Sequence, residues 1–304
     1  MNVILLKWAK RLAVVLLMCI FSYTALGQIN YGTTGLINMP TADMQRDKTF
    51  MATGVWLNHH ATVPRWWYDT WNYSINITIF PWLEIGYLCT GHKAVPTDYG
   101  NRSGYWVSST YGKFINQDRS FHGKLRIWKE GWWKEWIPQI VIGGNDIVGD
   151  SWNGGSMNAP SEMTYENGFL SRYFLSITKH FEFDKVGELG THFTWLYANR
   201  FDNDLNAPAF GANFRFALPA ITWWRKAING FNIMTEVLPG YTDVRENLTF
   251  DPDGPKYQAN IGLTYNFFAT FSPKTTKRFE VEAVLELNRC RYVSAGVEMK
   301  VHLK

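Results

Sequence analysis

Charged side chains recur at every second position in several segments of this chain, and residues spaced in this way share one face of a β-strand. The residues expected on such inward, charged faces are Glu84, Lys124, Arg126, Arg215, Glu236, Glu282, Glu286, Glu298 and Lys300. Facing acids and bases could form a packed salt-bridge core, because buried charges must be paired. They could equally line a wet pathway, since barrel interiors are generally polar. Charge alone leaves both interpretations open.

Motifs for covalent chemistry are absent from the sequence. It contains no G-x-S-x-G nucleophile elbow and no glycine-rich phosphate loop. His59 and His60 are adjacent and would point to opposite faces of a strand, and the other histidines are scattered. We therefore expect no catalytic, cofactor-binding or metal-ligating residues. An outer-membrane lipid- or glycan-modifying enzyme remains the alternative, because a fold does not fix a function.

The elements that would position the charged residues are β-strands. From Val293 to Leu303 every second residue is apolar, and the residues between them are polar or small. A period of two predicts a strand and excludes a helical face. Applied along the chain, it predicts about twelve strands, at 48–58, 72–80, 83–90, 119–128, 137–147, 170–181, 189–199, 209–217, 230–238, 257–268, 278–288 and 291–303.

The length and number of these strands indicate the fold class. Most are close to the roughly 9–11 residues that a tilted strand needs to cross a bilayer, and an even number is typical of bacterial barrels. We therefore predict an all-β fold, a transmembrane antiparallel up-and-down β-barrel.

The connections support this arrangement with two exceptions. The first, third, fifth and ninth connections are long, whereas the second, sixth and tenth are short, as expected for outer loops and periplasmic turns. The eighth, 218–229, is longish for a periplasmic turn. The eleventh, Arg289-Cys290, is very short for an outer loop.

The N-terminus predicts export. Lys7, Lys10 and Arg11 precede the apolar run 12–21, and small residues end at Gly27, which is the pattern of a cleaved signal peptide over residues 1–27. Three of the 30 basic residues lie in that segment, so 27 remain against 26 acidic residues. This near-neutral balance gives no indication of nucleic-acid binding, which requires a concentrated basic face.

Aromatic residues make up 16% of the chain, which is ordinary for a barrel with aromatic girdles. Trp and Tyr gather near expected strand ends, where they could anchor the barrel at headgroup depth or stack on sugar rings. These groups are Trp66, Trp67, Tyr68 and Trp71; Trp128, Trp132, Trp133 and Trp136; and Trp223 and Trp224. A ligand-stacking role is more plausible for the loop residues Tyr99, Tyr105, Trp106 and Tyr111.

The segment after the signal peptide contains the motif Gly35-Leu36-Ile37, followed by Pro40-Thr41-Ala42. Further along the chain are Pro81-Trp82-Leu83-Glu84, Gln117-Asp118-Arg119-Ser120, Gly143-Gly144-Asn145-Asp146 and the stretch from Ser171 to Phe181. In these motifs the chain resembles the YjbH-like exopolysaccharide-associated outer-membrane family.

The resemblance implies an outer-membrane β-barrel that assists exopolysaccharide or capsule biosynthesis or export without catalysis. The implied partners are outer-membrane lipid, polysaccharide and proteins of the export machinery. We expect residues 28–47 to form a periplasmic lead-in to a barrel of residues 48–304. This segment could be a lid, a plug or a strand lead-in, and Pro40 excludes a regular central strand there.

Overall fold

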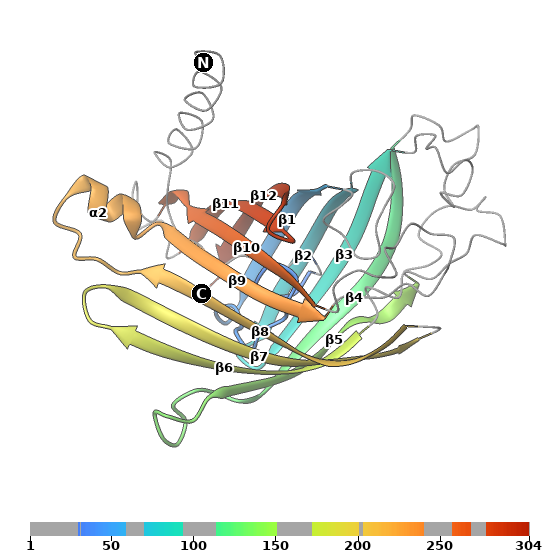
Figure 1. The fold of residues 1–304 in the computed structure, drawn as a ribbon, viewed down its shortest axis with the longest axis horizontal. Helices are drawn as coiled ribbons and strands as arrows, with labels where there is room; N and C mark the ends of the chain where they lie inside the picture. The colour runs from blue at the N-terminus through green and yellow to red at the C-terminus, as the bar shows by residue number, and fades with distance from the viewer. Residues whose placement is uncertain are drawn as a thin grey trace, which may run out of the picture.

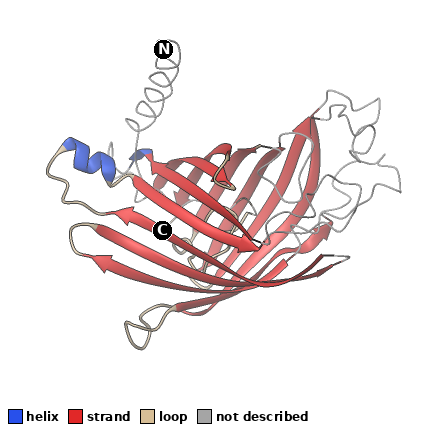
Figure 2. Cartoon of the chain, viewed as in Figure 1, coloured by secondary structure: helices blue, strands red, loops and turns tan. Residues whose placement is uncertain are grey.

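The computed structural model describes residues 30, 32–58, 70–93, 114–150, 172–200, 203–239, 257–268 and 278–303 of the chain. The strands are β1 (Thr49–Leu57), β2 (Thr70–Phe80), β3 (Leu83–Lys93), β4 (Phe114–Trp128), β5 (Gln139–Asp150), β6 (Arg172–Phe183), β7 (Gly187–Arg200), β8 (Asn203–Phe216), β9 (Phe231–Pro239), β10 (Tyr257–Asn266), β11 (Phe279–Asn288) and β12 (Tyr292–His302). A short helix, α2 (Trp223–Ile228), lies between β8 and β9 (Figure 2).

The strands form a closed barrel in which each strand is antiparallel to its sequence neighbours (Figure 1). The ring closes where β1 pairs with β12, from Thr49 opposite His302 to Trp56 opposite Ala295. This is the up-and-down order, so the predicted all-β class and the number of strands are confirmed. Among the described residues, no helix has the length and apolar character needed to cross a membrane.

Alternation along each strand separates an apolar outer face from a polar inner face. On β12, Val297 and Met299 are 49% and 45% exposed on the outside, whereas Glu298 and Lys300 between them are buried. This distribution is the reverse of that in a soluble protein and is typical of a membrane barrel. The buried core of the fold therefore lies inside the barrel, among charged side chains.

Two strands begin five or more residues earlier than the sequence pattern predicted. β4 begins at Phe114 rather than at 119, and β8 begins at Asn203 rather than at 209. Neither extension has a regular alternation of apolar and polar residues, so the period-two rule did not reveal them. Backbone pairing with the neighbouring strand continues through them, as from Ala198–Leu205 to Arg200–Asn203 between β7 and β8.

The two connections that fitted poorly leave the strand count unchanged. The eighth is long because it contains α2. In the eleventh, Arg289 and Cys290 have φ values of 53° and 52°, and Arg291 N donates to Asn288 O at 3.1 Å. Two positive φ values inside such a bond define a type I′ turn, whose twist matches that of a β-hairpin. A tight outer turn is therefore sterically accessible at this position.

Candidate functional site

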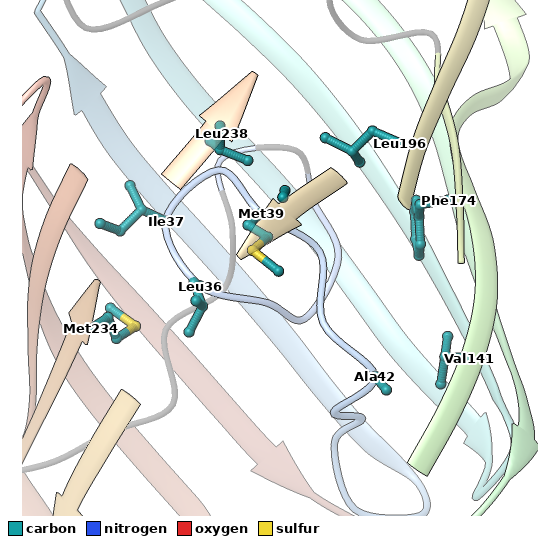
Figure 3. Packing of buried hydrophobic residues seen from close by; sticks show 10 residues of the cluster. Leu36, Ile37, Met39, Ala42, Val141, Phe174, Leu196, Met234 and Leu238 are labelled. Carbon is teal, nitrogen blue, oxygen red and sulfur yellow. The ribbon is translucent and has the colours of Figure 1, made fainter. Parts of the chain in front are cut away.

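Residues 32–47, here called the plug segment, lie inside the barrel rather than beside it. Figure 3 shows its loop, with Leu36, Ile37 and Met39, surrounded by side chains of the barrel wall. The loop is tight because Leu36 N donates to Met39 O at 2.9 Å and Gly35 bridges Pro40. Of the three roles left open for this segment, the structure shows a plug.

Apolar contacts seat the tip of the plug segment. Leu36, Ile37, Met39 and Ala42 are at most 3% exposed. They share one hydrophobic cluster with wall residues of β5 to β9, namely Val141, Phe174, Leu196, Ala209, Met234 and Leu238. Full burial of an aliphatic side chain of this size contributes about 1.5–3 kcal/mol. Five of the six family-motif residues therefore take part in this packing: Leu36, Ile37 and Ala42 belong to the cluster, and Gly35 and Pro40 form the bridge that closes the loop.

Glu236 on β9 binds the backbone of the plug tip. Its carboxylate accepts hydrogen bonds from Ile37 N at 3.1 Å, Asn38 N at 2.9 Å and Met39 N at 3.0 Å. Asn260 Nδ2 donates to the same carboxylate at 2.7 Å. Successive amides that converge on an anion form a nest. Here the nest belongs to the plug segment, and the anion belongs to the barrel wall.

Glu84 on β3 holds the start of the plug segment in a similar way. Its carboxylate accepts from Thr34 N at 2.6 Å, from Thr34 Oγ1 at 2.7 Å and from Asn76 Nδ2 at 2.7 Å. Close approach is possible because Gly86 has no side chain, since a Cβ there would lie 2.1 Å from Gly32 O. Gly32 itself has φ +79°, a conformation that favours glycine.

The wall of β4 to β7, which lies between β3 and β9 in the ring, donates hydrogen bonds to carbonyl oxygens of the plug segment. Arg172 Nη2 donates to Asn38 O at 2.7 Å, and Lys124 Nζ donates to Thr34 O at 2.8 Å. Neutral polar side chains of the same wall also donate to the plug segment. Thr194 and Ser176 donate to Pro40 O at 2.6 and 3.2 Å, and Gln139 donates to Ala42 O at 2.6 Å. The wall therefore has a donor side on β4 to β7 and an acceptor side on β3 and β9.

Asp43 of the plug segment contacts an ionic cluster near the short turns. Asp43 Oδ1 lies 3.2 Å from His180 Nε2, and His180 Nδ1 lies 2.7 Å from Glu130 Oε2 in the turn between β4 and β5. Lys179 also pairs with Glu130. Burial raises the pKa of Glu130, but the hydrogen bonds from Lys179 and His180 outweigh it, so that this pKa is lowered overall.

A second buried cluster joins β11 to β12. Lys300 Nζ lies 2.8 Å from Glu282 and 2.6 Å from Glu298, and His302 Nε2 lies 2.8 Å from Glu280. Glu286 on the same face accepts from Asn30 Nδ2 at 3.0 Å. These groups satisfy one another inside the barrel, which is the arrangement that buried charges require.

The structure separates the predicted charged residues into three groups. Glu84, Lys124, Glu236 and Glu286 contact the plug segment or Asn30, whereas Glu282, Glu298 and Lys300 contact one another. Arg126 and Arg215 lie nearer the short turns, where Arg126 donates to Pro81 O and Arg215 pairs with Glu188. The predicted stacking residues Tyr99, Tyr105, Trp106 and Tyr111 lie outside the described residues.

Several plug contacts were missed by the sequence reasoning, among them Asn76, Gln139, Arg172, Ser176 and Thr194. All five share the inward parity of their strands, so extending the period-two rule from charged to neutral polar residues would have found them. Their partners are backbone atoms of a distant segment, which no local pattern reveals.

Many of the polar groups around the plug segment bind its backbone atoms. In the part of the chain that the structure describes, no group of three His, Cys, Asp or Glu side chains could hold a metal ion. The fold and site together define a β-barrel whose interior is filled by a segment preceding the first strand.

Comparison with known proteins shows that the N-terminal part of this chain is similar to one family. Residues 27–157 match the model of the YjbH family, "Exopolysaccharide biosynthesis protein YbjH". The chain is also 31% identical over 123 residues to the "Uncharacterized lipoprotein YjbH" of Escherichia coli (strain K12). That alignment covers 40% of this chain and only 15% of the relative. The chain is thus YjbH-like over the plug segment and β1 to β5, as its motifs predicted.

Solved structures with a similar fold include outer-membrane proteins. The Omp33 outer membrane protein of Acinetobacter baumannii matches with a TM-score of 0.33 and 7% identity, covering 84% of this chain and 98% of that chain. A mutant of the Rh. blastica porin matches with a TM-score of 0.30 and 9% identity over the same shares of the two chains.

Proposed function

We propose that this protein is a non-catalytic outer-membrane β-barrel that assists exopolysaccharide or capsule biosynthesis or export. One observation carries the proposal: the segment that contains the family motif is the plug of the barrel. The residues by which the chain resembles an exopolysaccharide biosynthesis family are thus the residues that close its interior.

Membrane placement is supported by the outer surface. The barrel presents apolar side chains outward along its strands, and most strands have the length that a tilted crossing needs. Exposed tryptophans gather at the end with the short turns, where Trp132, Trp133 and Trp136 lie in the β4–β5 turn and Trp223 and Trp224 lie in α2. Rings at headgroup depth anchor barrels in this way.

A binding role is supported by the interior. The sequence alone allowed two interpretations of the inward charged residues, a packed salt-bridge core or the lining of a wet pathway. Around the plug segment these charged groups are packed. Glu84, Lys124 and Glu236 are at most 1% exposed and are engaged with the plug backbone. Groups held in this way bind and position a chain and are not poised to transfer protons to a substrate.

The first test is placement of the protein in the cell. It should fractionate with outer membranes and migrate faster on detergent gels before heating than after heating, because an intact barrel is compact. Recovery as a soluble periplasmic protein would show that the membrane assignment is wrong.

The second test separates assistance of export from enzymatic modification of lipids. Deleting the gene should lower surface or secreted polysaccharide and leave the lipid A and phospholipid profiles unchanged. Complementation with His122→Gln should restore the polysaccharide, since this buried ring bonds to Asn145 and an enzyme would instead require it as a base. If an assembled His122 variant fails to complement, or if the lipid profile changes, the enzyme is the better explanation.

A further inference from the structure

Residues Asn38–Asp43 of the plug segment lie along the barrel wall as an extended ligand would. From Asn38 to Asp43 its contacts advance along the inward positions of β6, from Arg172 through Ser176 and Thr178 to His180. From Asn38 to Ala42 the carbonyl oxygens that accept from the wall are those of alternate residues, Asn38, Pro40 and Ala42. The carbonyl oxygen of Asp43, the next residue, accepts from Lys124. In an extended chain the oxygens of alternate residues recur about every 6.6 Å, at about 3.3 Å per residue.

The wall that receives these oxygens contains cations. Lys124 and Arg172 are at most 2% exposed, and both donate to neutral backbone carbonyls of the plug segment. A carboxylate oxygen carries a net negative charge, so a cation in a low-dielectric interior attracts it more strongly than a neutral carbonyl oxygen. The donor wall is therefore better matched to a carboxylate-bearing chain than to the peptide that now occupies it.

The polar contacts between the plug segment and the barrel wall are made mainly by the backbone of the plug segment. Backbone carbonyls accept from Lys124, Gln139, Arg172, Ser176 and Thr194, and backbone amides donate to Glu84, Glu236 and Thr178. Contacts of this type recognise an extended polymer with regularly spaced oxygens and do not depend on a particular side chain. Sugar hydroxyls can also donate to the two carboxylates that now hold plug amides.

We propose that the inner face of β4 to β7 is a binding track for an extended acidic polysaccharide, and that residues Asn38–Asp43 occupy this track as an internal competitor. The inference rests on the proposed function, because it assigns a polysaccharide to the same interior. The plug then closes the barrel at rest, and an acidic polymer that binds the vacated track shifts the equilibrium towards an open interior.

The experiment measures exposure of the plug segment in the full-length, membrane-reconstituted protein. Ala42 is fully buried, so Ala42→Cys in a Cys290→Ser background reacts with a maleimide only when the plug leaves the wall. The probes are alginate oligomers, which are acidic, and dextran, which is neutral. At about ten times its Kd, a ligand that binds only the open state should raise the labelling rate about tenfold.

Two matched variants locate the effect. Arg172→Gln removes a cation from the track and should abolish the acceleration by alginate. Arg215→Gln makes the same substitution on an arginine that pairs with Glu188 and, among the described residues, makes no hydrogen bond to the plug segment, so it should keep the acceleration. The measurement is repeated with Glu236→Gln, in which the plug is held less tightly and competition needs less ligand.

The expected result is acceleration by alginate, no acceleration by dextran, and loss of the effect in Arg172→Gln alone. The proposal of a binding track for an acidic polysaccharide would be refuted if alginate left the labelling rate unchanged in both the parent and the Glu236→Gln protein. It would also be refuted if dextran accelerated labelling as much as alginate. The proposed function fails separately: if gene deletion leaves surface polysaccharide unchanged, the assistance of export is wrong whatever alginate does.

Discussion

The contact between Glu236 and the plug tip gives a quantitative prediction. Glu236→Gln keeps the shape of the side chain but replaces the carboxylate that three successive plug amides share, those of Ile37, Asn38 and Met39. A bond to a charged acceptor contributes about 1 kcal/mol more than a neutral one, which amounts to about 3 kcal/mol for three bonds. Removing a buried charge also relieves part of its desolvation cost, so we expect a net loss of about 2 kcal/mol in plug seating.

Hydrogen exchange detects this loss directly. Since about 1.4 kcal/mol corresponds to a factor of ten, backbone amides of the plug segment should exchange roughly 30-fold faster in Glu236→Gln. The strands should keep their protection, because the barrel closes through its own backbone pairs. Mass spectrometry of peptides that cover residues 32–47 and, separately, β1 and β12 measures both quantities.

Glu188→Gln is the matched control, since Glu188 pairs with Arg215 at 3.3 Å and, among the described residues, makes no hydrogen bond or ion pair with the plug segment. The reasoning is refuted if plug exchange in Glu236→Gln rises no more than in this control. It is also refuted if all strands lose protection together, because the plug would then be an inseparable part of the barrel core.

Three further predictions concern the close approach of the plug segment to β3, the direction of the side chains on β12, and the pH dependence of the β4–β5 turn. Gly86→Ala places a Cβ 2.1 Å from Gly32 O and should expose residues 32–36 to protease. Gly54→Ala is the control, because a Cβ at that position meets no atom within 4 Å, and it should not increase cleavage. Equal cleavage of the two variants would contradict the close approach of Gly32 to Gly86. Val297→Arg on the outer face should cost roughly 2–4 kcal/mol and prevent assembly, as followed by heat-modifiable gel mobility. Glu298→Gln on the inner face should still assemble, and equal behaviour of the pair would mean that the facing is wrong. The lowered pKa of Glu130 means that its bonds to Lys179 and His180 stabilise the β4–β5 turn above the ordinary pKa of 4.5 and are lost as the pH falls through the lower folded value. Exchange of the turn amides should therefore rise on acidification in the parent protein and show a weaker pH dependence in Glu130→Gln.

Much of the barrel was predictable because strand parity is a local property. Val297 and Glu298 are adjacent, and a period of two alone assigns them to opposite faces. The same rule located twelve strands, since each must present an apolar face to its surroundings. It failed at the beginning of β4 and β8, where the backbone ladder continues through residues that do not alternate regularly between apolar and polar.

The site was only partly predictable, because its two halves are far apart in the chain. The sequence singled out Glu236 as an inward charge and Gly35 to Ala42 as a motif, but nothing in either segment indicates that they meet. Glu236 and Ile37 are 199 residues apart, and their hydrogen bond exists only after the barrel has closed. The parity of a strand fixes the direction of a side chain but not the object that it meets.

The sequence by itself therefore determined the class of fold, the number of strands, their facing and the resemblance to a YjbH-like family. The tertiary structure alone decided that the segment before β1 enters the barrel and that the charged interior around it is packed. The physical reason is that a buried charge is tolerable only with partners, and those partners are backbone amides and carbonyls. Every residue carries these groups, so they leave no signature in the sequence, and only the closed barrel shows which of them Glu84, Lys124 and Glu236 bind.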